Sequence, residues 1–240
     1  MSSNNGMMKQ IAKLGLLLMI GGSMSACAGF LGIGGTSWKE EVLLHDGQKI
    51  IIDRSQSYGG RSEPGQSGPI KEHTISFMLP GSSKTITWAS EYGEELGRTN
   101  FNLLAVHVLN GTPYIVASPN LCLSYNKWGR PNPPYVFFKY EGKAWQRIPL
   151  EALPAEFKTI NVVLSIQKFQ ADKLSSRGLT SAEKIEELNL HVEQAAHKTI
   201  LREAVKNGSG VTGCEVLVDY KCGWGAPGEF NRKYFESICK

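Results

Sequence analysis

The stretch FNLLAVHVLNGTPYIVAS, residues 101–118, joins two apolar runs through Asn110 and Gly111. Both runs are rich in β-branched and aromatic residues, which favour strands. Asn followed by Gly is the pair that most readily adopts positive φ at both central positions of a tight turn. The stretch therefore predicts an antiparallel β-hairpin in the middle of the chain.

Similar runs flank this hairpin on both sides. Asp46-Gly47 separates EVLLH from QKIIID, Glu141-Gly142 separates PYVFFKY from KAWQRIPL, and residues 74–90 and 160–166 add a further hairpin and a single strand. About nine strands are therefore expected within residues 40–170. A β-propeller needs roughly 40–45 residues per blade and at least four blades. The length therefore favours an antiparallel β-sandwich or open barrel.

The segment that begins at Thr180 has the pattern of a helix. Thr180 and Glu183 have capping-box spacing, and Asn207-Gly208 is a typical helix stop. Between them, apolar and small side chains recur at helical spacing and gather on one face, at Ile185, Leu188, Val192, Ala195, Ala196, Thr199 and Ile200. The sequence therefore predicts one long amphipathic helix over residues 180–207, packed on an open face of the sheet.

Together these elements predict a mainly β fold with one long C-terminal helix, in a single globular domain over residues 40–240. The hairpins occupy residues 40–170, and residues 208–240 are expected to form an irregular tail tied by disulfides. The net charge of +4 is too small to favour nucleic acid as a partner.

The N-terminal segment has the organisation of a secretory signal. Lys9 and Lys13 precede the apolar run LGLLLMIGG, which is too short to span a membrane as a helix. The following Met24-Ser25-Ala26-Cys27 resembles the lipobox of bacterial lipoproteins, with Met in place of a common Leu. This resemblance implies that residues 1–26 are removed, that Cys27 receives diacylglyceryl and an N-linked acyl chain such as palmitate, and that residues 27–39 form a flexible tether. Ala rather than Asp at position 28 favours the outer membrane, with the domain facing the periplasm.

The five cysteines fit this interpretation. With Cys27 assigned to lipid, an even number remains for an oxidising compartment, at Cys122, Cys214, Cys222 and Cys239. Four cysteines allow three pairings; we expect Cys214 with Cys222 and Cys122 with Cys239. A zinc site is the alternative, but no C-x-x-C pair is present. No metal and no cofactor are expected.

A weak catalytic pattern is present at Ser124 and Lys127, which match S-x-x-K of penicillin-binding enzymes. Those enzymes place the serine at the start of a helix and add a K-T-G strand, and the sequence predicts neither, since Gly129 and several prolines follow directly. The alternative function that this pattern supports is a periplasmic hydrolase acting on cell-wall or carbohydrate material.

A more prominent feature is SYNKWGRPNPPYVFF, residues 124–138, in which aromatic and basic side chains alternate. Exposed aromatic rings and arginine on a rigid scaffold contribute much binding energy. The candidate binding surface comprises Tyr125, Lys127, Trp128, Arg130 and Tyr135. The competing interpretation is that these rings cover one end of the core. The sequence favours a non-enzymatic lipoprotein, either a binding module or an envelope-structural component, attached to the membrane by its lipid and contacting an envelope protein or a cell-wall polymer.

Overall fold

The structure, a computed structural model, describes residues 35–61, 68–206 and 213–239. The predicted signal peptide, the lipidation site Cys27 and most of the predicted tether lie outside the described residues. Among the described residues, no helix is long and apolar enough to cross a membrane.

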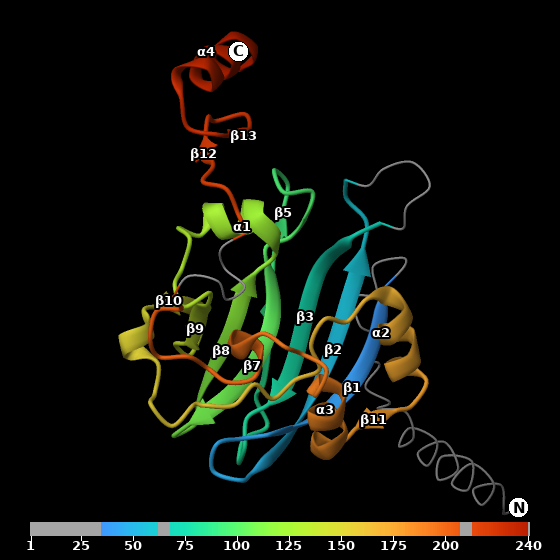
Figure 1. The fold of residues 1–240 in the computed structure, drawn as a ribbon. Helices are drawn as coiled ribbons and strands as arrows, with labels where there is room; N and C mark the ends of the chain where they lie inside the picture. The colour runs from blue at the N-terminus through green and yellow to red at the C-terminus, as the bar shows by residue number, and fades with distance from the viewer. Residues whose placement is uncertain (1–34, 62–67, 207–212, 240) are drawn as a thin grey trace, which may run out of the picture. The chain divides into compact units, whose positions relative to one another are not determined.

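The described chain is mainly β, and its larger sheet has the order β11-β1-β2-β3-β4 (Figure 1). The strands are β1 (Thr36–Leu43), β2 (Lys49–Tyr58), β3 (Ile70–Met78), β4 (Thr85–Ala89) and β11 (Leu179–Thr180). Neighbours pair antiparallel except β1 with β11, which is parallel. Burial alternates along β2, as expected where one face of a sheet packs on a core. The two hairpins predicted in this region are confirmed.

The second sheet has the order β10-β9-β8-β7 and contains the hairpin predicted over residues 101–118. Its strands are β7 (Phe101–Leu109), β8 (Thr112–Pro119), β9 (Val136–Tyr140) and β10 (Trp145–Ile148). Asn110 and Gly111 have φ of 50° and 73°, as the tight turn requires. Both sheets contribute side chains to one hydrophobic core, in which Ile52 and Ile75 of the first sheet join Ile115 and Val116 of the second.

The remaining elements are short. The helices are α1 (Leu121–Lys127), α2 (Lys168–Ser175), α3 (Ala182–Asn189) and α4 (Glu229–Ile238), with 3₁₀ turns η2 (Leu150–Ala152) and η3 (Ala195–His197). Two-residue strands form two further ladders, β5 (Tyr92–Gly93) with β6 (Arg98–Thr99) and β12 (Val218–Asp219) with β13 (Trp224–Gly225). Figure 1 shows α2 and α3 beside β1, at the edge of the larger sheet.

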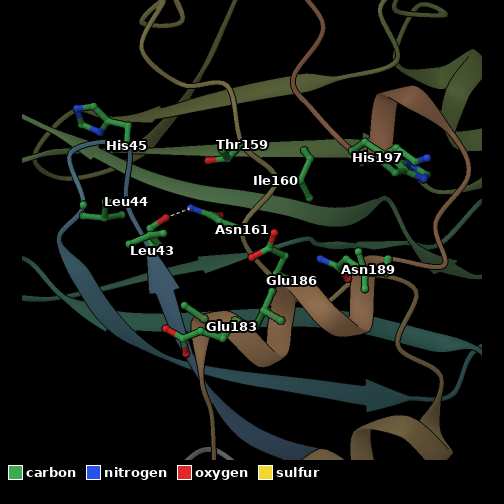
Figure 2. A pocket seen from close by; sticks show the side chains of 15 residues that line it. Leu43, Leu44, His45, Thr159, Ile160, Asn161, Glu183, Glu186, Asn189 and His197 are labelled. Atoms are coloured by element: carbon green, nitrogen blue, oxygen red, sulfur yellow. Dashed lines mark hydrogen bonds between the residues drawn. The ribbon is translucent and has the colours of Figure 1, made fainter.

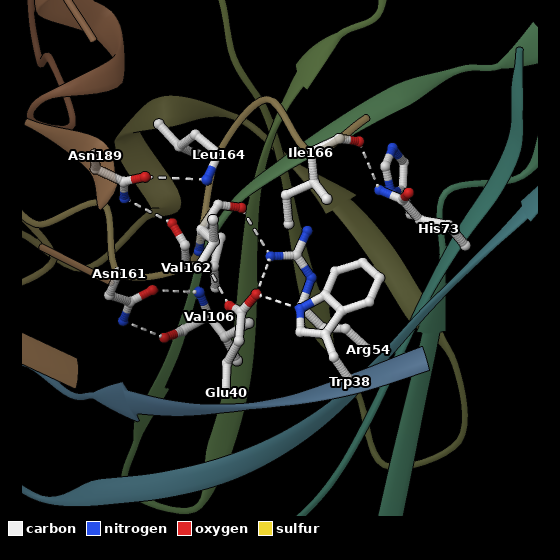
Figure 3. Close-up of polar contacts among 12 residues, drawn as sticks. Trp38, Glu40, Arg54, His73, Val106, Asn161, Val162, Leu164, Ile166 and Asn189 are labelled. Atoms are coloured by element: carbon white, nitrogen blue, oxygen red, sulfur yellow. Dashed lines mark hydrogen bonds and ion pairs between the residues drawn. The ribbon is translucent and has the colours of Figure 1, made fainter. Parts of the chain in front are cut away.

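The predicted strand over residues 160–166 is wrong, although Asn161–Leu164 and Ile166 are buried. Side chains rather than a neighbouring strand satisfy the backbone of this segment (Figure 3). Val163 N–H donates to Glu40 Oε2 at 3.1 Å, and Val163 C=O accepts from Arg54 at 2.8 Å. Glu40 and Arg54 form a buried ion pair at 2.7 Å. Glu40 and Arg54 therefore satisfy both backbone groups of Val163, as a neighbouring strand would.

Two asparagines complete this arrangement. Asn161 accepts from Val106 N–H at 2.9 Å and donates to Val106 C=O at 2.8 Å, and it also donates to Leu43 C=O at 3.1 Å. The Asn189 side chain accepts a hydrogen bond from Leu164 N–H and donates one to Val162 C=O. Because Val106 lies in β7 and Leu43 at the end of β1, Asn161 connects one strand of each sheet.

The predicted helix over residues 180–207 is also wrong, so the expected fold class with one long C-terminal helix is corrected to a β fold with short helices. Helix α3 begins after Ser181, whose hydroxyl caps it, and ends at Asn189, whose amide is held by the buried segment. Beyond η3, Thr199 pairs with Thr159 and Ile200 N–H donates to Lys158 C=O. These tertiary hydrogen bonds replace the helical ones that the periodicity predicted.

Both expected disulfide pairings are wrong, although all four described cysteines are paired. Cys122 bonds to Cys214, and Cys222 bonds to Cys239. The first disulfide attaches the tail to α1. The second closes a small unit in which Phe235 of α4 stacks on Tyr220 with ring centroids 4.9 Å apart.

Candidate functional site

The structure brings together four of the five side chains of the predicted binding surface, in two pairs. The Arg130 guanidinium lies 5.0 Å from the Tyr125 ring centroid, and Lys127 and Trp128 both donate to the side-chain oxygen of Asn100.

Tyr125 and Tyr135 are 8% and 3% exposed. The Tyr135 hydroxyl lies 2.9 Å from Ala196 C=O and 3.0 Å from Thr199 C=O, and burial raises its pKa to about 12. Tyr135 therefore anchors the chain beyond η3 to the second sheet.

The other three side chains also make internal contacts. Arg130 donates to the carbonyls of Cys214 and Glu215, both at 2.9 Å, and so helps to hold the tail against α1. Lys127 forms an ion pair with Glu95 and thereby holds the pKa of that carboxyl below its usual value. Trp128 is half-buried, with its ring centroid 4.6 Å from that of Phe101. Lys127, which is exposed, and the half-buried Trp128 and Arg130 thus supply the accessible part of this surface.

The S-x-x-K pair does not have the geometry of a nucleophile and its base. Ser124 lies in the middle of α1, a helix that the sequence interpretation had missed, and is fully buried. Its hydroxyl donates to Asn100 C=O, whereas Lys127 Nζ donates to the Asn100 side-chain oxygen at 3.2 Å. The two side chains are thus directed to different groups of the same asparagine.

A cavity of about 720 Å³ lies between the β1–β2 turn, the segment 159–161, helix α3 and the end of η3. We call it the α3 groove. Its apolar part comprises Leu43, Leu44, Ile160, Ile185 and Leu190, and polar side chains surround it (Figure 2). A volume in this range is typical of ligand-binding clefts.

The polar walls of the α3 groove are fixed by the contacts already described. Asn161 and Asn189 both line it, and their amides are engaged by backbone groups of the two sheets and of the buried segment. Glu183 is held by Lys49 at 2.9 Å, and the hydrogen bond from this lysine lowers the pKa of Glu183 to about 2. The hydrogen-bonding groups of these side chains are engaged within the protein. Asn161, Asn189 and Glu183 therefore form fixed walls of the groove.

Other polar side chains of the α3 groove are available to a ligand. Within the described part of the chain, the side chains of Glu186, Lys198 and Thr159 make no hydrogen bond or ion pair, and Glu186 and Lys198 are exposed. Figure 2 shows the Glu186 carboxylate reaching from α3 towards the segment 159–161, with His45 and His197 at opposite ends of the groove. Burial lowers the pKa of His197, which is therefore neutral at neutral pH. The groove thus offers one free carboxylate, one free ammonium group and an apolar floor.

The sequence interpretation did not single out this site, because its walls come from four separate segments. No spacing within any one segment marks Glu186, Lys198 or Asn161 as neighbours. Among the described residues, no group of three or more His, Cys, Asp or Glu side chains is placed to hold a metal ion. The chain matches no protein-family model, no curated protein and no solved structure.

Proposed function

We propose that the chain is a lipid-anchored binding protein of the bacterial envelope, and that its partner lies in the α3 groove. The lipid is carried by Cys27, and the domain faces the periplasm from the outer membrane. The lipobox resemblance of Met24–Cys27 supports the anchor. The two disulfides support an oxidising compartment, because such bonds are rare where thiols are kept reduced.

The observation that supports the binding proposal is the pair of charged side chains, Glu186 and Lys198, that line the groove without a partner among the described residues. Glu186 and Lys198 are unpaired within the described chain, whereas the neighbouring Glu183 is paired with Lys49. A peptide segment with side chains of both signs and an apolar residue between them would complement this arrangement. We therefore favour an envelope protein over a cell-wall sugar polymer as the partner.

Crosslinking in intact cells tests the groove. A photoreactive residue replaces Glu186 in one strain, Glu187 in a second and Trp128 in a third. Glu187 is the matched control, because it is adjacent on α3, is paired with Lys184 and does not line the groove. We expect a specific protein adduct from position 186 and none from 187. Equal or absent adducts at these two positions would contradict the proposal that the partner binds in the α3 groove. An adduct from position 128 alone would indicate that the binding surface is the segment 124–138.

The anchor is tested separately. Cys27→Ser should abolish incorporation of radiolabelled palmitate and move the chain from the outer-membrane fraction to the soluble periplasmic fraction. Ala28→Asp is the control for sorting, since it should retain the lipid and shift the chain towards the inner membrane. Palmitate labelling of the Cys27→Ser variant would contradict the assigned lipidation site.

The alternative, a periplasmic hydrolase using Ser124 and Lys127, has no contact in the described chain that favours it. Ser124→Ala leaves the α3 groove unchanged, so this variant distinguishes the two hypotheses. Cell-wall turnover that depends on the Ser124 hydroxyl would support the hydrolase.

A further inference from the structure

A second cavity, of about 740 Å³, lies on the other side of η3. We call it the disulfide pocket, because the Cys122–Cys214 disulfide forms part of its wall. Other parts of the wall come from the paired ends of β7 and β8, from α1 and from residues 193–205. His197 lines both cavities, so η3 separates the disulfide pocket from the α3 groove.

The wall of the disulfide pocket is largely apolar. Pro119, Leu121, Pro134, Leu201 and Val205 all contribute to it. Leu121 is 60% exposed and has φ of 64°, a conformation that costs energy for a residue with a branched side chain. This strain places a large apolar side chain at the rim of an apolar cavity.

The wall is also held rigidly. Besides the disulfide, Arg130 and Asn126 of the α1 region donate to the backbone carbonyls of Cys214 and Glu215. A rigid cavity loses little conformational entropy when a ligand enters it. These contacts therefore favour a preformed binding site.

Three side-chain oxygen atoms in the lining of the pocket have no partner in the part of the chain that the structure describes. Ser118 is 7% exposed, and its hydroxyl makes no hydrogen bond within the described residues. Asn102 is its cross-strand neighbour; its amide nitrogen donates to Asn120, which leaves its side-chain oxygen available. The Tyr125 hydroxyl, which also belongs to the lining, makes no hydrogen bond in the described chain either. The Ser118 hydroxyl therefore lines the pocket without a partner among the described residues and is available to a ligand.

The charges around the pocket exclude an anionic ligand. Among its described lining residues there is no lysine or arginine, and the one carboxylate is Glu193, which is exposed. Burial lowers the pKa of His197, so this imidazole is neutral at neutral pH. A buried anion would therefore lack a counter-charge, which is costly.

We propose that the disulfide pocket binds an uncharged, mostly apolar small molecule with a hydroxyl or amide group at one end, which Ser118 and Asn102 receive. This site is distinct from the α3 groove and does not depend on the proposed envelope partner. The two cavities select different chemistry, because the groove presents free charges and the disulfide pocket presents free neutral polar groups.

A matched pair of photoreactive probes tests this proposal on the full chain. 4-(Hydroxymethyl)benzophenone is uncharged and carries one hydroxyl group, whereas 4-benzoylbenzoate has the same rings and a carboxylate. We expect saturable labelling by the uncharged probe, with adducts on peptides that contain Leu121, Tyr125 or Leu201, and no saturable labelling by the carboxylate. Equal saturable labelling by both probes, or adducts confined to other surfaces such as the exposed Phe230 of α4, would overturn the proposal.

Two tryptophan variants locate the site. Ala195 is exposed and lines only the disulfide pocket, so Ala195→Trp should fill that pocket without disturbing the core and should abolish saturable labelling. Ala182 lines only the α3 groove, and Ala182→Trp should label like the wild type. Labelling that survives Ala195→Trp would overturn the assignment.

Ser118→Ala separates a ligand-binding role from a structural one. Because its hydroxyl has no partner among the described residues, its removal should leave the melting temperature unchanged, while the probe should bind about fivefold more weakly through loss of one hydrogen bond. A lower melting temperature with unchanged probe binding would show that the hydroxyl is structural and would overturn its assigned role.

Discussion

Replacing Glu40 by glutamine should destabilise the fold by about 3–5 kcal/mol, although the side-chain shape is kept. Glu40 is fully buried and accepts hydrogen bonds from Trp38 at 2.7 Å, from Arg54 at 2.7 Å and from the Val163 N–H at 3.1 Å. The substitution leaves the Arg54 guanidinium, which is 4% exposed, without its counter-charge. The unpaired, buried guanidinium makes the largest contribution to the expected loss of unfolding free energy.

The double variant gives the sharper result. Arg54→Met alone should cost a similar amount, because it leaves the Glu40 carboxylate unpaired. Glu40→Gln with Arg54→Met removes both charges. The Val163 carbonyl then has no donor, and either Trp38 Nε1–H or Val163 N–H has no acceptor, because the glutamine amide keeps one accepting oxygen. Each orphaned buried group costs about 1–3 kcal/mol, and no unpaired charge remains, so the double variant should lose much less unfolding free energy than the sum of the two single losses.

Urea unfolding followed by tryptophan fluorescence measures these differences, since the buried Trp38 touches the ion pair. Asp53→Asn is the control on the same two strands. The Lys39–Asp53 pair has side chains 54% and 58% exposed, and its loss should change the unfolding free energy by less than about 1 kcal/mol. A double variant that loses the sum of the two single losses would refute the reasoning, because it would show no coupling between the charges.

The remaining predictions concern pH, the tail and the buried segment. Burial lowers the pKa of His73 to about 3 and of His107 to about 4, against 6.5 as their ordinary value. Below pH 6.5 these two histidines become protonated in the unfolded chain but stay neutral in the folded chain. The unfolding free energy should therefore fall by about 2 kcal/mol between pH 6 and pH 5. Urea midpoints measured across this range should show a shallower slope in His73→Gln, and an unchanged slope would count against the assignment. Replacing Cys222 and Cys239 by serine should remove hydrogen-exchange protection from α4 without moving the urea midpoint of the core, because α4 buries no residue; a midpoint shift would mean that the tail and the core unfold together. Asn161→Ala should cost about 3 kcal/mol in urea unfolding, since one backbone N–H and two carbonyls lose their partner; a loss below about 1 kcal/mol would indicate that water replaces the amide.

The hairpins were predictable because their signals are local. Asn110 and Gly111 tolerate the positive φ of their turn, and Gly47 and Gly142 have φ of 84° and 79° in two others. A turn residue acts on its immediate neighbours, so its conformational preference is visible in one sequence.

The wrong predictions share one physical origin, which is pairing between distant segments. Residues 160–166 have strand composition, yet their hydrogen-bonding partners are side chains of Glu40, Arg54 and Asn189. The helical periodicity beyond Asn189 is real, but tertiary contacts such as Tyr135 with the chain after η3 prevail over it. The disulfide pairing depends on which turn of α1 meets the tail, and spacing carries no information about that.

The failure of regular pairing also explains where the two cavities lie. A strand or helix fills space with a repeating backbone ladder, whereas the segments 159–166 and 194–201 are held by individual side chains and a few isolated backbone hydrogen bonds, and both segments line cavities. Asn161 shows the consequence most directly, because it both connects β1 with β7 and lines the α3 groove. Binding and stability should therefore be lost together when Asn161 is replaced. At Glu186, which has no partner in the described chain, binding should be lost alone.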